Sequence, residues 1–342
     1  MHDFMDVKLF ELYHGPVPAV LAELAETPAL RRLGQVGMNC GCEYTAFPQF
    51  AGSGSYSRLE HSLGVGVIVW HFTEDPAQAA AGLLHDVATP TFAHVVDFLR
   101  GDYLTQEATE EGTRERIAAS PAIHAVLARH GLSTDEVADY HRYPIADNDS
   151  PRLSADRLEY SLGNALRWGF LTREEIAALY ADLRVGVNEE GSPELVFGSP
   201  VLASRFANAA LACSKVYVSD ADRYAMQALS ELLARALEAG VLSPADLYGT
   251  EPALIAKLEA SPLAADWRRF QNIGRILRAD TPPDGRPWRQ IPAKKRRIDP
   301  LTAGCGRASA FDPVFAADLN TFLAEPQTEW LLAESHAVSE IF

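Results

Sequence analysis

The residues best suited to do chemistry are two histidines and two aspartates in three separate segments. His61 lies in the first segment, the pair His85–Asp86 follows an apolar run, and Asp156 lies further along the chain. An ionisable residue is rarely buried without a partner, so a histidine and an aspartate at the end of an apolar helix need coordination or counter-charges. Two imidazoles and two carboxylates form a mixed ligand set that suits one divalent metal, such as Mn, Fe, Ni, Co, Zn or Mg.

Two more residues lie in register with these candidate ligands if their segments are helical. Arg58 precedes His61 by three positions, and Tyr160 follows Asp156 by four. Residues three or four positions apart share one face of an α-helix. The sequence therefore predicts a guanidinium and a phenol beside two of the candidate ligands.

In their order, these motifs resemble those of the HD-domain metal-dependent phosphohydrolases, and among them the dNTP triphosphohydrolase-like branch. The match covers roughly residues 10 to 235. The matching motifs are His14-Gly15, Thr27-Pro28, Arg32-Leu33, Arg58-Leu-Glu-His61-Ser-Leu-Gly64, His85-Asp86 with Phe92 and His94, and Asp156-Arg-Leu-Glu-Tyr160.

The resemblance implies an enzyme that cleaves phosphate esters or anhydrides with metal-activated water. Its substrate would be a nucleotide or a similar small phosphorylated molecule. The metal ligands implied by the resemblance are His61, His85, Asp86 and Asp156. The residues implied to face the substrate phosphate are Arg58, Arg157 and Tyr160, and the catalytic set is Arg58, His94 and Asp97.

Two family histidines are replaced in this chain. Thr89 stands four residues after His85, and Gln106 stands where another histidine would follow. The candidates that remain for proton transfer are the pair His94–Asp97, Glu107 and Glu110. In that pair, Asp97 is expected to orient the ring and to favour its protonated form.

The segment expected to recognise sugar and base departs further. Gly34 stands where relatives have an arginine tied to an effector nucleotide, and Met38 stands where they have a glutamine that touches the sugar. A different small phosphate is therefore as good a substrate candidate as a dNTP. The alternative from another class is a metal-containing nucleotide-binding or sensory protein with little catalysis.

Composition limits the partners. The formal net charge of −16 over 342 residues repels polyanions, so nucleic acid is not an expected partner. The one dense basic run, Lys294-Lys-Arg-Arg297, is more typical of a solvated loop than of a binding site. No apolar run of about 18 residues and no leader-like start are present, which predicts a soluble cytoplasmic protein with no membrane partner. Four cysteines in such a chain predict reduced thiols, and we expect a homo-oligomer such as a dimer.

Apolar residues recur at three- and four-residue spacing over most of the chain, which predicts a mainly α fold, an HD-domain helical bundle. The exception is 183–197, where two short apolar runs flank a Gly-containing turn and predict a small β-hairpin. Breakers near Gly240 separate a catalytic unit at 1–240 from a mixed C-terminal extension at 241–342, expected to pack on the catalytic unit or on a second subunit. The predicted helices are 19–33, 59–72, 77–86, 91–99, 114–129, 134–140, 153–168, 206–237 and 251–277, with one more after Pro313.

Overall fold

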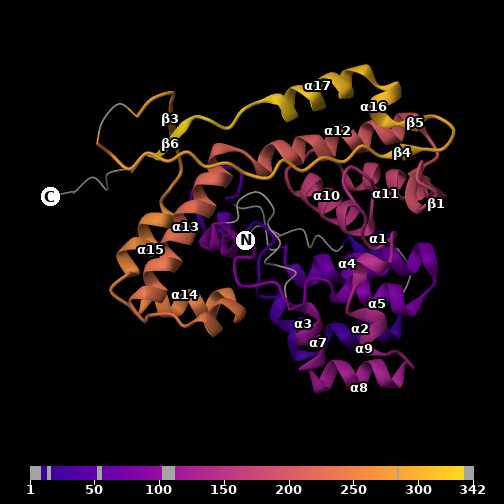
Figure 1. The fold of residues 1–342 in the computed structure, drawn as a ribbon, viewed down its shortest axis with the longest axis horizontal. Helices are drawn as coiled ribbons and strands as arrows, with labels where there is room; N and C mark the ends of the chain where they lie inside the picture. Colours follow the sequence, from indigo (N-terminus) through magenta and orange to yellow (C-terminus); the bar gives the residue numbers. More distant parts are fainter. Residues whose placement is uncertain (1–8, 14–16, 52–55, 102–111, 283–284, 335–342) are drawn as a thin grey trace.

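The computed structural model of the chain describes residues 9–13, 17–51, 56–101, 112–282 and 285–334. Helices dominate these residues (Figure 1), and the strands form two small sheets. The predicted mainly helical bundle with a β-hairpin is confirmed. Within the described ranges, no helix combines the length and the apolar character needed to cross a membrane.

The helices that carry the candidate ligands pack against one another. α4 (Arg58–Thr73) lies along α5 (Pro76–Leu84) and also contacts α10 (Ala155–Arg167). Two glycines allow α4 and α5 to approach closely. A Cβ on Gly66 would lie 3.1 Å from the carbonyl oxygen of Ala79, and a Cβ on Gly82 would lie 3.2 Å from Val69 Cγ2. Larger side chains at these glycines would therefore push the ligand-bearing helices apart.

The starts of these helices are encoded by the residues just before them. Ser57 and Glu60 form a capping box at α4, where each side chain accepts a hydrogen bond from the other residue's backbone N–H. Asp75 caps α5, whose first residue is Pro76, and Ser154 caps α10 by accepting from the N–H of Arg157. Local sequence thus determines where each ligand-bearing helix begins.

Several predicted helices are divided in the structure. Pro28 and Pro121 each begin a new helix, because proline lacks the N–H that would continue the preceding one. Ser219 divides the predicted helix 206–237 by capping the second half. The predicted helix 91–99 begins later, since Phe92 and Ala93 have φ angles of 60° and 45° and form a turn instead.

The remaining helices surround this centre or belong to the C-terminal third of the chain. They are α1 (Phe10–Tyr13), α2 (Ala19–Ala25), α3 (Pro28–Leu33), η1 (Cys42–Tyr44), α6 (Val95–Arg100), α7 (Thr113–Ala118), α8 (Pro121–Arg129), α9 (Thr134–Val137), η2 (Tyr140–Arg142), α11 (Arg173–Asp182), α12 (Pro200–Tyr217), α13 (Asp220–Glu238), η3 (Pro244–Tyr248), α14 (Glu251–Glu259), α15 (Ala264–Gln271), α16 (Ala308–Phe311) and α17 (Pro313–Ala324).

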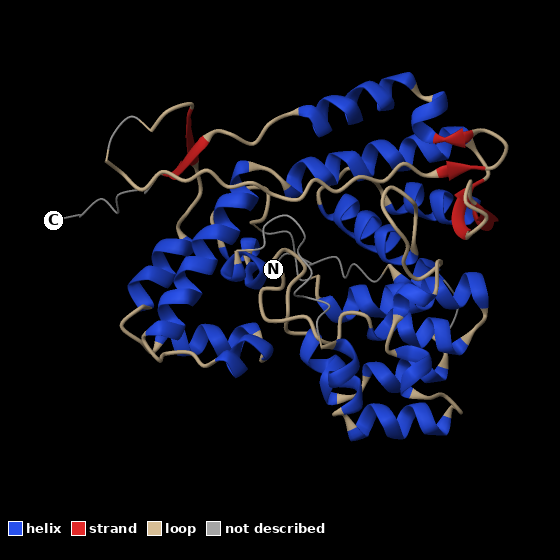
Figure 2. Cartoon of the chain, in the orientation of Figure 1, coloured by secondary structure: helices blue, strands red, loops and turns tan. Residues whose placement is uncertain are grey.

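The strands form two groups that Figure 2 shows in red at opposite ends of the upper part of the molecule. In the first, β1 (Leu183–Val187) and β2 (Pro193–Phe197) make the predicted antiparallel hairpin. β2 then pairs in parallel with β4 (Leu301–Thr302), and β4 pairs antiparallel with β5 (Gly306–Arg307). In the second, β3 (Ile276–Ala279) pairs antiparallel with β6 (Trp330–Ala333).

Residues after 240 pack closely on residues before it. One hydrophobic cluster combines Phe92 and Leu229 with Trp267 and Leu331. α17 packs on α12, and an extended segment passes beside α12 from the β3–β6 pair to β4 (Figure 1). That segment, residues 289–300, bears on the site described next.

Candidate metal centre

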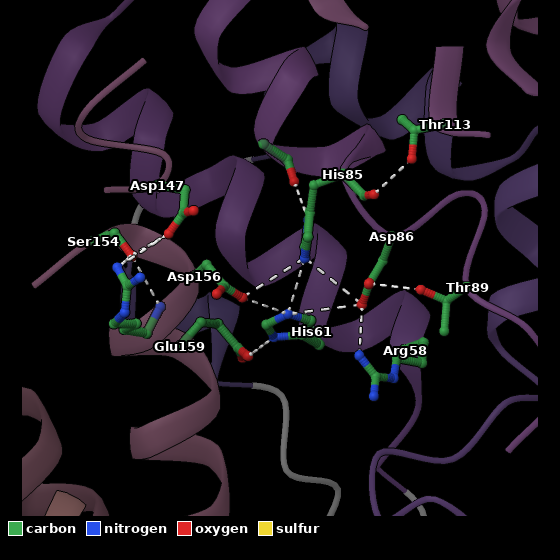
Figure 3. Close-up of polar contacts among 12 residues, drawn as sticks. Arg58, His61, His85, Asp86, Thr89, Thr113, Asp147, Ser154, Asp156 and Glu159 are labelled. Carbon is green, nitrogen blue, oxygen red and sulfur yellow. Dashed lines mark hydrogen bonds and ion pairs between the residues drawn. The ribbon is translucent and has the colours of Figure 1, made fainter. Parts of the chain in front are cut away.

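The four candidate ligands converge in space, as Figure 3 shows. The Nε2 atoms of His61 and His85 lie 3.3 Å apart. Asp156 Oδ1 lies 3.1 Å from the first of these nitrogens and 3.7 Å from the second. Asp86 Oδ2 lies 3.9 and 3.6 Å from the same two atoms. Three segments distant in sequence therefore place four donor atoms around one point.

The other nitrogen of each imidazole is held by a hydrogen-bond acceptor. His85 Nδ1 lies 2.7 Å from the carbonyl oxygen of Gly82, which can only accept, so Nδ1 carries the proton. His61 Nδ1 lies 2.6 Å from Glu159 Oε2 and donates to it in the same way. Both Nε2 atoms thus face the two carboxylates and each other, and each can offer its lone pair to a metal when it carries no proton. The donor atoms of His61, His85 and Asp86 all lie within 4.8 Å of one another, so these residues fit one divalent cation, and Asp156 lies beside both imidazoles as a fourth candidate ligand.

The electrostatics of the site also favour a positive charge. Burial opposes protonation of His61, yet hydrogen bonds to Asp156 and Glu159 raise the pKa of this ring to about 10. Burial alone would raise the pKa of Asp86, but Arg58 and the two imidazoles hold it well below its usual range. The carboxylate is therefore ionised and available as a ligand.

Both oxygens of Asp86 are held by neighbouring side chains. Arg58 Nη1 donates to Oδ2 at 3.0 Å, and Thr89 Oγ1 donates to Oδ1 at 2.7 Å. Thr89, which stands where the resemblance implies a histidine, is fully buried and holds Asp86 in this way. Arg58 lies in the cavity wall beside the candidate metal ligands, where the sequence predicted a phosphate contact.

Two residues that orient His61 were not singled out in the sequence. Glu159 accepts a hydrogen bond from His61 and a second one from the Tyr56 hydroxyl. The sequence does hold a signal for Glu159, which follows Asp156 by less than one helical turn and so lies near the same face of the helix. Two glycines make room for the side chains of Glu159 and Tyr56. A Cβ on Gly64 would lie 2.7 Å from Glu159 Cγ, and one on Gly163 would lie 2.5 Å from the Tyr56 hydroxyl oxygen.

The predicted substrate residues on α10 also lie in the cavity wall. Arg157 Nη1 lies 3.1 Å from Asp147 Oδ1 and donates to Asn148 Oδ1 at 2.9 Å, so its guanidinium is held in a fixed direction. Burial raises the pKa of Tyr160 to about 12, so its hydroxyl remains a donor at neutral pH.

His94 is oriented by residues on two sides. Its Nδ1 lies 2.9 Å from Asp97 Oδ2, and its Nε2 lies 3.3 Å from Arg296 Nη2. Burial lowers the pKa of His94, and the nearby Arg296 and Arg58 add to this effect, while the hydrogen bond to Asp97 opposes it. The hydrogen bond from Arg296 needs a lone pair on Nε2, so this contact favours the neutral ring, whereas the sequence led us to expect the protonated form. Asp97 is fully buried and is not one of the residues that line the cavity.

These groups open into a cavity of about 890 Å³. Its wall includes two residues of the basic run that the sequence suggested to be a solvated loop, Lys294 and Arg296. Asp222 and Met226 line another part of the wall. Positions named in the sequence that lie outside the described residues are His14, Gly15, Gln106, Glu107 and Glu110.

Comparisons with known proteins agree with this arrangement. No protein-family model matches the chain. It is 26% identical over 246 residues to the uncharacterized protein YdhJ of Bacillus subtilis, covering 72% of each chain. It is 28% identical over 214 residues to the metal-dependent phosphohydrolase cns2 of Cordyceps militaris, covering 61% of this chain and 56% of that protein. The chain thus spans little more than half the length of the second relative.

Solved structures share the fold. A phosphohydrolase from Bacteroides thetaiotaomicron superposes with a TM-score of 0.65 at 16% identity, over 94% of this chain and 96% of that one. A hypothetical protein from Aquifex aeolicus superposes with a TM-score of 0.60 at 18% identity, over 88% and 90%. At these identities the likeness is one of fold, and it extends through the C-terminal third of the chain.

Proposed function

We propose that this chain is a metal-dependent phosphohydrolase of the HD type that acts on a small phosphorylated substrate. The observation that carries the proposal is the convergence of two imidazole Nε2 atoms and two carboxylates on the wall of a large cavity. The name of the Cordyceps relative and that of the Bacteroides structure support the same reaction class. The ligands in this proposal are His61, His85, Asp86 and Asp156.

A divalent cation bound there would supply Lewis-acid chemistry, because it withdraws charge from a phosphoryl oxygen and makes water more acidic. The chain's own residues would then bind and orient the phosphate. Arg58 and Arg157 stay protonated, and each is held in one direction by a carboxylate, so their N–H groups can face the charge that develops on the phosphoryl oxygens. Tyr160 adds a neutral donor in the same wall.

His94 is suited to accept a proton. Its Nδ1–H donates to Asp97, so the lone pair of the neutral ring lies on Nε2, which takes a hydrogen bond from Arg296. When Arg296 turns to a substrate oxygen, this nitrogen can take a proton from water. Asp97 acts through the ring as a positioning residue.

The substrate class in this proposal is a nucleotide or a molecule of similar size. A cavity of about 890 Å³ is in the range of pockets that enclose such ligands. The net charge of −16 speaks against nucleic acid, whereas a few arginines and a metal can reverse the potential within one pocket. A homo-oligomeric state and a cytoplasmic location remain predictions from the sequence.

A phosphate-release screen tests the function. Purified protein would be supplied with Mn²⁺, Co²⁺, Ni²⁺ or Mg²⁺ and with nucleoside mono-, di- and triphosphates, and both orthophosphate and tripolyphosphate would be measured. We expect release with at least one metal and none from the Asp86→Ala variant. Release of tripolyphosphate would support the dNTP triphosphohydrolase-like branch. Tight nucleotide binding with no release from any substrate would favour the sensory alternative.

A further inference from the structure

The extended segment between β3 and β4 carries the basic run Lys294–Arg297, and its side chains alternate. Lys294 and Arg296 line the metal-site cavity, whereas Lys295 and Arg297 do not. Successive side chains of an extended chain point to opposite sides, which accounts for this alternation. Every second residue of the run therefore forms part of the cavity wall.

Lys295 fixes which side faces the cavity. Its Nζ donates to the carbonyl oxygens of Phe322 at 2.6 Å and Leu323 at 3.1 Å, and also to that of Glu325. These carbonyls end α17, where a helix carries partial negative charge and favours a cation. With Lys295 held on the α17 side, its two neighbours must face the other way.

The segment is anchored on both sides of the run. Arg223 Nη1 donates to the carbonyl oxygen of Ile291 at 2.7 Å, and the N–H of Ala293 donates to Gln327 Oε1 at 2.6 Å. Beyond the run, Ser150 Oγ donates to the carbonyl oxygen of Arg297 at 2.9 Å. Hydrogen bonds from Arg223 of α13, to Gln327 and from Ser150 thus set the positions of Lys294 and Arg296.

Both residues line the cavity, where Arg296 is half-buried and Lys294 is exposed. The guanidinium of Arg296 donates to His94 Nε2. Its charge also acts on Tyr160 and Asp222: burial raises the pKa of each of these residues, and Arg296 lowers it. Arg296 therefore lies beside His94 and acts on Tyr160 of α10 and Asp222 of α13, whereas Arg58 is paired with Asp86.

We propose that Lys294 and Arg296 form a second phosphate subsite, which binds a phosphate group other than the one held at the metal centre. The inference rests on the proposed function and narrows its substrate class to molecules with two or more phosphate groups, such as nucleoside di- or triphosphates. Arg58 and Arg157 already border the metal ligands on one side. Two further cations, brought into the same cavity wall from a distant segment of a strongly acidic protein, fit a second anion.

Binding of imidodiphosphate and orthophosphate to the metal-loaded protein tests the subsite. Imidodiphosphate carries two linked phosphoryl groups and resists hydrolysis, so calorimetry measures its affinity without turnover. We compare Arg296→Gln and Lys294→Gln with Arg297→Gln, which removes the same charge from the same run but at an exposed position outside the cavity wall. Thermal unfolding of each variant, and Arg296→Lys as a conservative replacement, separate a lost contact from a lost fold.

We expect Arg296→Gln to weaken imidodiphosphate binding roughly tenfold to a hundredfold, the range for one charge-assisted hydrogen bond, with orthophosphate changed less than about twofold. Lys294→Gln should give a smaller loss of the same kind, and Arg297→Gln should leave both affinities near the wild type. Equal losses in Arg296→Gln and Arg297→Gln, or an equal loss for both anions, would overturn the subsite.

The two proposals can fail separately. If the wild type releases phosphate and Arg296→Gln binds imidodiphosphate as the wild type does, the subsite is wrong and the hydrolase stands. If no phosphate is released from any substrate but Arg296→Gln still loses imidodiphosphate selectively, the subsite stands and the hydrolase is wrong.

Discussion

Replacing Glu159 by glutamine should weaken metal binding without touching a ligand. The carboxylate of Glu159 is buried and accepts hydrogen bonds from His61 Nδ1 at 2.6 Å and from the Tyr56 hydroxyl. Glutamine keeps the size and one hydrogen-bond acceptor, but it removes the negative charge that makes the His61 imidazole a stronger metal ligand. Loss of such a partner typically costs 10- to 100-fold in metal affinity, or about 1.4–2.7 kcal/mol.

The assay is a competition titration of Mn²⁺ or Ni²⁺ against a fluorescent chelator. Glu251→Gln is the matched control, because Glu251 is also a buried carboxylate that accepts from a tyrosine, Tyr44, at 2.8 Å, but it contacts no ligand. We expect this control to bind metal as the wild type does, even if both variants unfold at lower temperature. If Glu159→Gln also retains wild-type affinity, the hydrogen bond to His61 does not tune the site and the reasoning fails.

Three further outcomes follow from the same geometry. Asp86→Ala should lose nearly all bound metal by elemental analysis, because it removes a ligand and leaves the Arg58 charge without its carboxylate. Arg157→Ala should retain the metal but lower kcat by the equivalent of about 2–4 kcal/mol. Unchanged kinetics would mean that Arg157 only forms its ion pair with Asp147 and does not contact the substrate. With His94 acting as a base, activity should fall as the pH drops through the pKa of His94, which lies below the ordinary histidine value. Arg296→Gln removes a nearby positive charge, so it should move this acidic limb of the pH–activity profile to higher pH. An acidic limb that stays at the same pH in this variant would argue against His94 as the base.

Much of the fold follows from local patterns. The spacing of apolar residues predicts a helix at 59–72, and the observed α4 runs from Arg58 to Thr73, after the capping box of Ser57 and Glu60. Four of the misplaced boundaries have three different causes. At Pro28 and Pro121 a proline signal competes with continuous helical periodicity, and at Ser219 a capping residue begins a second helix within such a periodic run. At Phe92 the turn depends on positive φ angles that no residue type there predicts.

The candidate site, too, could be predicted only in part from the sequence. Its ligands are visible in the sequence because each has a chemistry that burial would otherwise penalise, as with His85 and Asp86. The hydrogen bonds between ligands and their supporting residues are long-range pairs, such as His61 with Glu159 and Arg58 with Asp86, and their register depends on how α4, α5 and α10 pack. The protonation of His94 could not be predicted from Asp97 alone, since Arg296 comes from a segment about 200 residues away.

The basic run shows why composition alone misplaces such residues. Four adjacent cations in an acidic chain suggest a solvated loop, because nothing local offers them partners. In the folded chain, the end of α17 supplies carbonyl acceptors for Lys295, and that contact turns Lys294 and Arg296 to the cavity. The orientation of these two side chains therefore depends on carbonyl groups at the end of α17, 27 to 30 residues further along the chain than Lys295. Shortening α17 should loosen the cavity wall even though α17 contributes no residue to it.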